Sequence, residues 1–301
     1  MKTLRLLIFF LLIFNVISAQ EILSFKTSDG ESLFYTKIGM GPTIILLAGG
    51  PGVSVNTMQA WADTLSPNFE CILFDQRGTG LSSNVRLDST TINLERATKD
   101  IDELRKHLGR EQISLCGISW GGGLSQAYAS FYPNNVKKMV LVSTIGPDLT
   151  LFEAMGDNIW MRRYPNERDS LEYWNKQPSS PTSELKKAIF FFLPYVYDHN
   201  SGYNLWLDFL SKISNNSTMS SLMWKDLDKN YDLKNRLINY KGQCIIIKPR
   251  QDIIPEESCY LIKELLPQTK MISIEKSGHM PALENPEAFY PALKKAFLDN
   301  F

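Results

Sequence analysis

The stretch Ile113-Ser114-Leu115-Cys116-Gly117-Ile118-Ser119-Trp120-Gly121 places a short apolar run directly before a Gly-x-Ser-x-Gly motif. The run predicts a buried strand, and the spacing of apolar residues over 122–131 predicts a helix immediately after the motif. A serine in so tight a turn between a strand and a helix is forced into a strained, exposed conformation. Glycines flank it because larger side chains would collide across the turn. Ser119 is therefore the predicted nucleophile.

Short, continuous apolar runs of the same kind recur along the chain. Such runs predict strands that are buried on both faces, as in a parallel sheet covered by helices. Helical spacing between them, for example over residues 94–108, predicts a doubly wound α/β fold. Residues 23–39 predict an antiparallel hairpin at one edge of the sheet. The predicted parallel strands are residues 43–47, 71–74, 113–116, 139–142, 244–247 and 271–274.

The alternation stops between residues 146 and 240, where no strand pattern occurs but 16 of the 34 aromatic residues lie. We predict that residues 146–240 form a helical cap inserted after the sixth strand, between core segments at residues 20–145 and 241–301. The aromatic residues would build a small structural core or line a lid over an active site, and both interpretations stay open. Residues 215–218 are interpreted as a solvated loop.

A serine hydroxyl needs a base, usually a histidine that a carboxylate orients. The chain has three histidines. His107 lies at the end of a predicted helix, and His199 is interpreted as part of a solvated loop in the cap. Only His279 follows the last predicted strand, at the edge where the catalytic groups of open α/β sheets gather. We therefore predict that His279 is the base.

The acid should come from another strand end, between the serine and the histidine in the chain. Asp252 lies on the loop that follows the strand at residues 244–247, and it is the predicted acid. Glu256 and Glu257 remain alternatives, although they fall in the first turn of the next predicted helix, where acidic residues favour the helix dipole.

A developing oxyanion needs two preorganised N–H donors. The backbone of Trp120, next to the nucleophile, is predicted to supply one. The loop after the strand at residues 43–47 reads Ala48-Gly49-Gly50-Pro51-Gly52. Glycine lets the backbone approach a substrate, and proline has no N–H to offer, so Gly50 is the predicted second donor.

The first residues have the pattern of a secretory signal peptide at residues 1–19. Lys2 and Arg5 precede an apolar run over residues 6–17, and Ser18-Ala19 forms a small-residue cleavage site. A helix of that run would span roughly 18 Å, well short of the ~30 Å hydrocarbon core of a membrane. The sequence thus predicts an exported protein, periplasmic or secreted, without a stable membrane anchor after cleavage.

Charge and cysteine content limit the classes of partner. Lys plus Arg number 32, as do Asp plus Glu, so there is no electrostatic reason to expect nucleic acid. Four cysteines without a Cys-x-x-Cys pair predict neither a disulfide scaffold nor a metal site, and we predict no cofactor. Cys71, Cys116 and Cys244 are interpreted as buried hydrophobic residues. If a disulfide forms after export, Cys244 and Cys259 are the candidate pair.

Several motifs together resemble the α/β-hydrolase fold and, within it, the proline iminopeptidase family. Their order and spacing cover about residues 30–300, and Asp75 with Arg77 is interpreted as a pair that braces its loop. The resemblance implies a triad of Ser119, Asp252 and His279, a cap between strands six and seven, and release of an N-terminal residue, typically proline, from peptides. The motifs are Gly49-Gly50-Pro51-Gly52, Asp75-Gln76-Arg77-Gly78, Gly117-Ile118-Ser119-Trp120-Gly121-Gly122, and Gly278-His279-Met280-Pro281 with Leu283-Glu284-Asn285-Pro286.

Two positions depart from the family's pattern. Ala48 stands where the family usually has histidine, and Asn175 follows Trp174, where aminopeptidases of the family often carry an acid for the substrate's ammonium. Glu172 and Glu184 lie nearby without an assigned role. The first specific hypothesis is a serine hydrolase that acts as an aminopeptidase on short peptides. The alternatives are a carboxylesterase for small apolar acyl groups and a non-catalytic protein that binds a small molecule.

Overall fold

The computed structural model of the protein describes residues 21–299, and the predicted signal peptide at residues 1–19 lies outside these residues. Its strands are β1 Glu21–Lys26, β2 Ser32–Ile38, β3 Thr43–Leu47, β4 Glu70–Phe74, β5 Ile113–Ile118, β6 Val136–Val142, β7 Gln243–Pro249 and β8 Lys270–Ile274. They form one sheet in the order β1-β2-β4-β3-β5-β6-β7-β8. β2 runs antiparallel to β1 and β4, and all other neighbours are parallel. The predicted doubly wound sheet with an edge hairpin is confirmed.

Helices fill the connections between the strands. Those of the strand–helix alternation are α1 Gln59–Leu65, α2 Leu94–His107, α3 Trp120–Phe131, α10 Glu257–Leu265, α11 Pro281–Glu284 and α12 Pro286–Leu298. A longer set follows β6 and precedes β7, where the sequence predicts the cap. It comprises α4 Phe152–Arg162, α5 Pro165–Asn175, α6 Pro181–Phe192, the 3-10 turn η4 Leu193–Tyr195, α7 His199–Lys212, α8 Ser217–Asn230 and α9 Lys234–Leu237.

The sheet is buried on both faces, which is why its strands are continuously apolar. On β3, Ile44 and Leu46 belong to one hydrophobic cluster, whereas Ile45 and Leu47 belong to the other. α1 and α12 cover the first face, with the rings of Trp61 and Phe289 4.7 Å apart. α2, α3 and α10 supply buried residues to the second. Each strand therefore places apolar side chains alternately into two cores.

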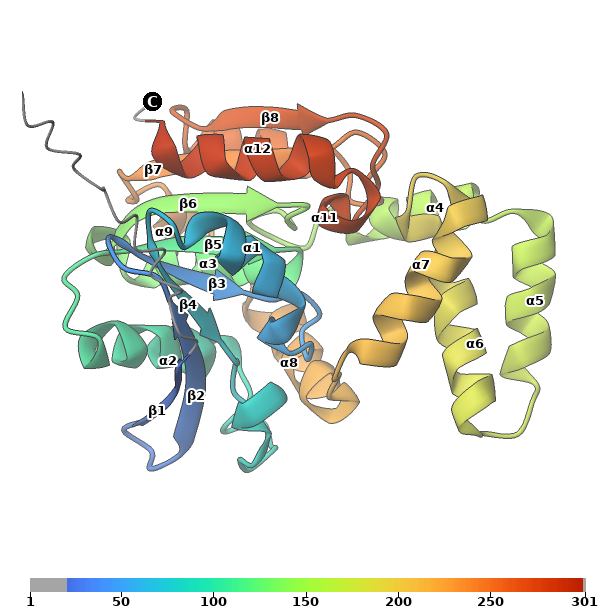
Figure 1. Ribbon diagram of the computed structural model, residues 1–301, viewed down its shortest axis with the longest axis horizontal. Helices are drawn as coiled ribbons and strands as arrows, with labels where there is room; N and C mark the ends of the chain where they lie inside the picture. Colours follow the sequence, from blue (N-terminus) through green and yellow to red (C-terminus); the bar gives the residue numbers. More distant parts are fainter. Residues whose placement is uncertain (1–20, 300–301) are drawn as a thin grey trace, which may run out of the picture.

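The helices between β6 and β7 divide into two groups. α4 to α7 project beyond the carboxyl ends of the parallel strands (Figure 1). Within this projection, α6, η4 and α7 build a small core of their own from Ile189, Leu193, Val196 and Trp206. α8 instead places Met219, Met223 and Leu227, spaced four residues apart, in the main core. α8 packs against α2 and α9 packs against α3, so the end of the segment at residues 146–240 lies on the core and not in the projection.

The predicted solvated loop at residues 215–218 is confirmed only in part, because Asn215, Ser217 and Thr218 are exposed but Ser217 and Thr218 already belong to α8. Asn215 forms an isolated bridge with Val53. Asn216 caps α8 by accepting the N–H of Met219 at 3.0 Å, and its side chain donates to the carbonyl of Gly78 at 2.8 Å. Asparagine suits a helix N-cap because its side-chain oxygen satisfies a free N–H of the first turn.

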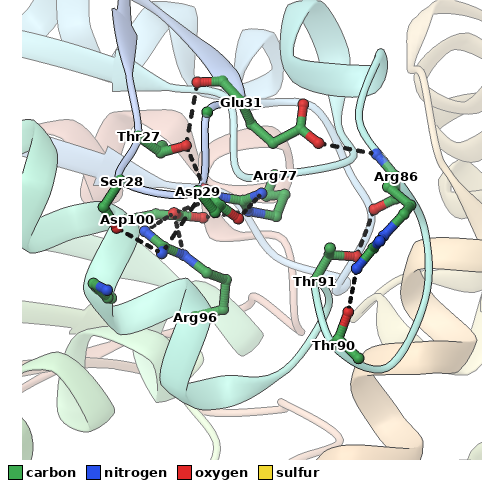
Figure 2. Close-up of polar contacts among 12 residues, drawn as sticks. Thr27, Ser28, Asp29, Glu31, Arg77, Arg86, Thr90, Thr91, Arg96 and Asp100 are labelled. Carbon is green, nitrogen blue, oxygen red and sulfur yellow. Dashed lines mark hydrogen bonds and ion pairs between the residues drawn. The ribbon is translucent and has the colours of Figure 1, made fainter.

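The expected pairing of Asp75 with Arg77 is also wrong, although both side chains brace loops. Asp75 accepts hydrogen bonds from the backbone of Val55 and Leu81 at 3.0 and 2.9 Å. Arg77 instead donates two hydrogen bonds of 2.8 Å to Asp100 and contacts Asp29 in the β1–β2 turn (Figure 2). The two residues are close in sequence, but their side chains bond to different neighbours.

Replacing Arg77 by methionine should lower the free energy of unfolding by about 3 kcal/mol, because it leaves the buried Asp100 with only Arg96 as a cationic partner. Urea unfolding checks this value. The matched control is Arg86→Met, which removes an exposed ion pair with Asp88 and should cost less than about 0.5 kcal/mol. Equal losses in both variants would contradict a structural role for Arg77.

The four cysteines are buried and free, as small hydrophobic residues would be, and the candidate pair Cys244 and Cys259 forms no disulfide in this structure. Over residues 21–299, no helix combines the length and apolar character needed to cross a bilayer.

Candidate active site

Ser119 lies at the turn between β5 and α3 with φ 55° and ψ −119°, a left-handed backbone that is unfavourable for serine. The flanking glycines explain how the turn closes. A Cβ added to Gly117 would lie 2.1 Å from the carbonyl oxygen of Gly121, and one added to Gly121 would lie 2.0 Å from that of Leu47. No other residue fits either position without moving the backbone. The turn therefore holds Ser119 in a partly exposed position at the carboxyl end of β5.

His279 and Asp252 meet at the same edge of the sheet. Asp252 follows β7 and His279 follows β8, and His279 Nδ1 lies 2.8 Å from Asp252 Oδ1. A proton on Nδ1 that is donated to the carboxylate leaves Nε2 free to accept one from a nucleophile. Within residues 21–299, the Ser119 hydroxyl makes no hydrogen bond to this imidazole. Such bonds are often long or poorly aligned before substrate binds.

A buried lysine helps to keep Asp252 ionised. Burial alone would raise the pKa of this carboxyl, but the positive charges of Lys248 and His279 and a hydrogen bond from the backbone of Ile254 hold it well below its ordinary value. Asp252 is thus ionised across the whole range in which an enzyme works. Sequence reasoning missed Lys248, although a lysine directly after Ile245-Ile246-Ile247 in a buried strand was a signal.

The alternative acids lie elsewhere. Glu256 and Glu257 are exposed at the start of α10, and Glu256 accepts a hydrogen bond from the hydroxyl of Tyr260. Neither contacts His279, whose carboxylate partner is Asp252.

His199 is not in a solvated loop, so that interpretation is wrong. It begins α7, its side chain is only 6% exposed, and Nδ1 lies 2.7 Å from Glu167 Oε1. Burial here depends on the packing of α5 against the start of α7. His107 ends α2 as predicted and stacks on Phe25.

Backbone donors surround the serine. The N–H groups of Trp120 and Gly50, the predicted pair, donate to no acceptor within residues 21–299, so both are free for a substrate oxygen. The same is true of Gly49, which sequence reasoning did not choose. An added Cβ on Gly49 would lie 3.3 Å from the Cβ of Ser119, so this glycine is directly beside Ser119. Glycine at this position keeps the space over the serine open for substrate.

We call the N–H groups of Trp120, Gly49 and Gly50 the donor site. Gln76 connects the two segments that form it, because it bonds to both Trp120 and Ala48. It accepts a hydrogen bond from the indole of Trp120 at 3.0 Å and donates to the carbonyl of Ala48 at 3.0 Å. All three residues are buried. This contact gives Gln76, which is part of the Asp-Gln-Arg-Gly motif, a structural role that its position in the sequence did not reveal.

The cap contacts the histidine loop directly through Tyr195. The carbonyl of Tyr195 accepts the N–H of His279 at 2.6 Å, and its ring lies edge-on to the imidazole with 5.4 Å between centroids. Burial raises the pKa of the Tyr195 hydroxyl to about 12, so it stays protonated. A Cβ on Gly278 would lie 2.2 Å from the Tyr195 carbonyl. Glycine before His279 therefore allows the cap to pack on the histidine loop.

Glu284 holds the same loop in place by accepting hydrogen bonds from its backbone. Its Oε2 accepts the N–H groups of Tyr197 and Gly278 at 2.6 and 2.9 Å, and Oε1 accepts that of Met280 at 3.0 Å. Burial raises the pKa of this carboxyl despite the three donors. Because two of the donors flank His279, Glu284 determines the path of the chain at this histidine.

Replacing Glu284 by glutamine should lower kcat about tenfold to a hundredfold, because the amide NH₂ cannot accept the hydrogen bonds that Oε2 accepts now. KM should change little, since Glu284 does not face the donor site. Steady-state kinetics check both values, with the exposed Glu287→Gln as the matched control. A normal kcat in the Glu284 variant would contradict its role in placing His279.

The fold and the site together define a class of protein. The family model of the α/β-hydrolase fold matches residues 42–286, and the chain belongs to this family of hydrolases. It is similar to a proline iminopeptidase from Heyndrickxia coagulans, with 25% identity over 260 residues that cover 83% of this chain and 88% of that protein.

Two solved structures share the fold. A proline iminopeptidase-related protein from Thermus thermophilus has a TM-score of 0.68 at 18% identity, with 92% of this chain and 97% of that chain covered. A thermophilic esterase from Thermogutta terrifontis has a TM-score of 0.67 at 20% identity, with the same coverage of 92% and 97%. Among the described residues, no group of three or more His, Cys, Asp or Glu side chains could hold a metal ion.

Proposed function

We propose that this hydrolase is a serine hydrolase that forms an acyl-enzyme at Ser119. The observation that carries the proposal is the strained serine turn at the same sheet edge as the buried Asp252–His279 pair. His279 takes the proton of Ser119 as the hydroxyl oxygen attacks the substrate carbonyl. The N–H of Trp120 and an N–H of the Gly49–Gly50 loop receive the oxyanion. The imidazolium then protonates the leaving group, and water releases the acid in a second, similar step.

Within this class, we propose an aminopeptidase that releases N-terminal proline or a similar residue. The support is the similarity to the proline iminopeptidase from Heyndrickxia coagulans, which extends over most of both chains. An aminopeptidase selects its substrate by pairing the free ammonium with an acid, as a buried unpaired charge would be costly.

A carboxylesterase is the second candidate, because three acids of the cap already have partners in the protein. Glu172 and Glu184 are exposed and form ion pairs with Lys176 and Lys187. The buried Glu167 is bound to His199 and to the backbone of Tyr164. An ester with an apolar acyl group needs no acid and gains only apolar contact with the aromatic cap.

A substrate panel separates the two candidates. We expect kcat/KM for prolyl-arylamide to exceed that for N-acetylprolyl-arylamide by far more than tenfold, which corresponds to ~1.4 kcal/mol. Alanyl-arylamide tests the preference for proline, and an aryl butyrate tests the esterase. A smaller preference for the free amine, with rapid cleavage of the butyrate, would replace the aminopeptidase by the esterase. Failure of a fluorophosphonate to label Ser119 would favour the non-catalytic alternative.

We also propose that the protein is exported after cleavage behind Ala19, on the pattern of residues 1–19. Expression in the native cell should yield a mature chain that begins at Gln20, in the periplasm or the medium. N-terminal sequencing of the fractionated protein checks this, and an intact Met1 in the cytosol would contradict it.

A further inference from the structure

Lys248 is a buried lysine that points at the acid of the proposed triad. It lies near the end of β7, and its side chain is only 7% exposed. Nζ lies 3.3 Å from Asp252 Oδ2 and donates a hydrogen bond to the carbonyl of Ile254. A lysine is rarely so buried unless its charge is paired. The charge of Lys248 is therefore matched to the carboxylate of Asp252.

The two carboxylate oxygens of Asp252 contact different partners. Oδ1 faces His279 Nδ1 and also accepts the N–H of Ile254 at 3.2 Å, whereas Oδ2 faces Lys248. The carboxylate itself is completely buried. Water cannot screen the three groups from one another, so each charge acts strongly on the next.

Other titratable groups lie around Lys248, Asp252 and His279, on the helices and turns that pack against them. Arg162 of α4 and Tyr195 of η4 act on Asp252 from the cap. Glu284 of α11 acts on His279, and Cys259 of α10 lies near Lys248 and Asp252. The guanidinium of Arg162 donates to the carbonyls of Gln251 and Val196 and does not bond to Asp252. Lys248 is therefore the cation that directly contacts the acid.

We propose that Lys248 is a positioning residue that neutralises Asp252 and so keeps His279 unprotonated, and able to act as a base, at lower pH. The proposal rests on the serine hydrolase mechanism above. In the resting state the charges of Lys248 and Asp252 cancel. When His279 takes the proton of Ser119, Asp252 stabilises the imidazolium and Lys248 opposes it. Without Lys248, the uncompensated carboxylate would hold a proton on the imidazole and block the attack.

The test is the pH dependence of kcat/KM. Lys248→Met keeps the length of the side chain and removes the charge, so the acid limb of the profile should move to higher pH by at least about one unit. KM at the plateau should change less than about twofold, because Lys248 does not face the donor site. Lys248→Arg retains the charge and should keep the wild-type limb. The matched control is the exposed Lys263→Met on α10, which should also keep it.

Three results would overturn the proposal: a limb in Lys248→Met that coincides with that of the wild type, an equal shift in Lys263→Met, or an equal shift in a folded Lys248→Arg. If Lys248→Met does not fold, Lys248→Gln decides by the same shift of the acid limb, since its amide removes the charge but can still donate to the carbonyl of Ile254. A wild-type limb in a folded Lys248→Gln would overturn the proposal. Absence of wild-type labelling by a fluorophosphonate would instead refute the serine hydrolase itself.

Discussion

Replacing Ser119 by alanine is expected to lower kcat by at least about 10⁴-fold while the fold stays intact. The hydroxyl is the atom that must attack the substrate, and no other group in the turn can take its place. Its removal should change the free energy of unfolding by less than about 0.5 kcal/mol, because Ser119 is partly exposed and its hydroxyl makes no hydrogen bond within residues 21–299.

Steady-state kinetics with the best substrate of the panel and thermal unfolding of the same sample measure both quantities. The matched control is Ser211→Ala, an exposed serine on α7 that should keep full activity. More than a tenth of the wild-type rate in Ser119→Ala would remove this residue from the mechanism.

Replacing Asp252 by asparagine is expected to lower kcat by about 10⁴-fold. An amide in place of Oδ1 no longer accepts the Nδ1 proton as a carboxylate does, so the imidazole can take the wrong tautomer and loses the charge that stabilises its protonated form. The exposed Glu256→Gln is the control, since this runner-up does not contact His279. If Glu256→Gln were inactive and Asp252→Asn active, the assignment of the acid would be wrong.

Asp252→Asn also gives a prediction for the pH dependence of the unfolding free energy. Because the pKa of Asp252 is lowered in the fold, ionisation of this group stabilises the protein at every pH above the ordinary carboxyl value of about 4. This contribution is lost as the pH falls below that value toward the lowered pKa of the folded state. Asp252→Asn lacks it and leaves Lys248 unpaired. The difference in unfolding free energy between wild type and variant should thus shrink as the pH falls below about 4.

Strand positions were predictable from the sequence because burial on both faces leaves a continuous apolar run. The predicted bounds of β3 match the structure, and each of the other predicted parallel strands is one to three residues longer than its predicted run. The turn at Ser119 was predictable in part for a local reason, since the clash that Gly117 avoids is with Gly121, within five residues of chain, whereas the clash that Gly121 avoids is with Leu47 on β3. Asp252 and His279 needed one further step, namely that parallel strands bring their carboxyl ends to one edge.

Contacts between distant segments were not predictable. The burial of His199 depends on Glu167, which lies 32 residues earlier, and the packing of Tyr195 on His279 joins the cap to the last loop of the core. Nothing in the local pattern of either segment records its partner.

The sequence by itself therefore determined the doubly wound sheet, the serine turn and the strand ends that carry the acid and the base, because these follow from short-range sterics and from the burial of each strand. Only the tertiary structure decided how the charges and the cap are arranged around them. It brought Tyr195 and Tyr197 of the cap to the histidine loop and Gly49 to Ser119, and it buried Lys248 together with Asp252. Hydrogen bonds and ion pairs act over a few ångströms in space, whereas the packing of the whole chain decides which residues come that close.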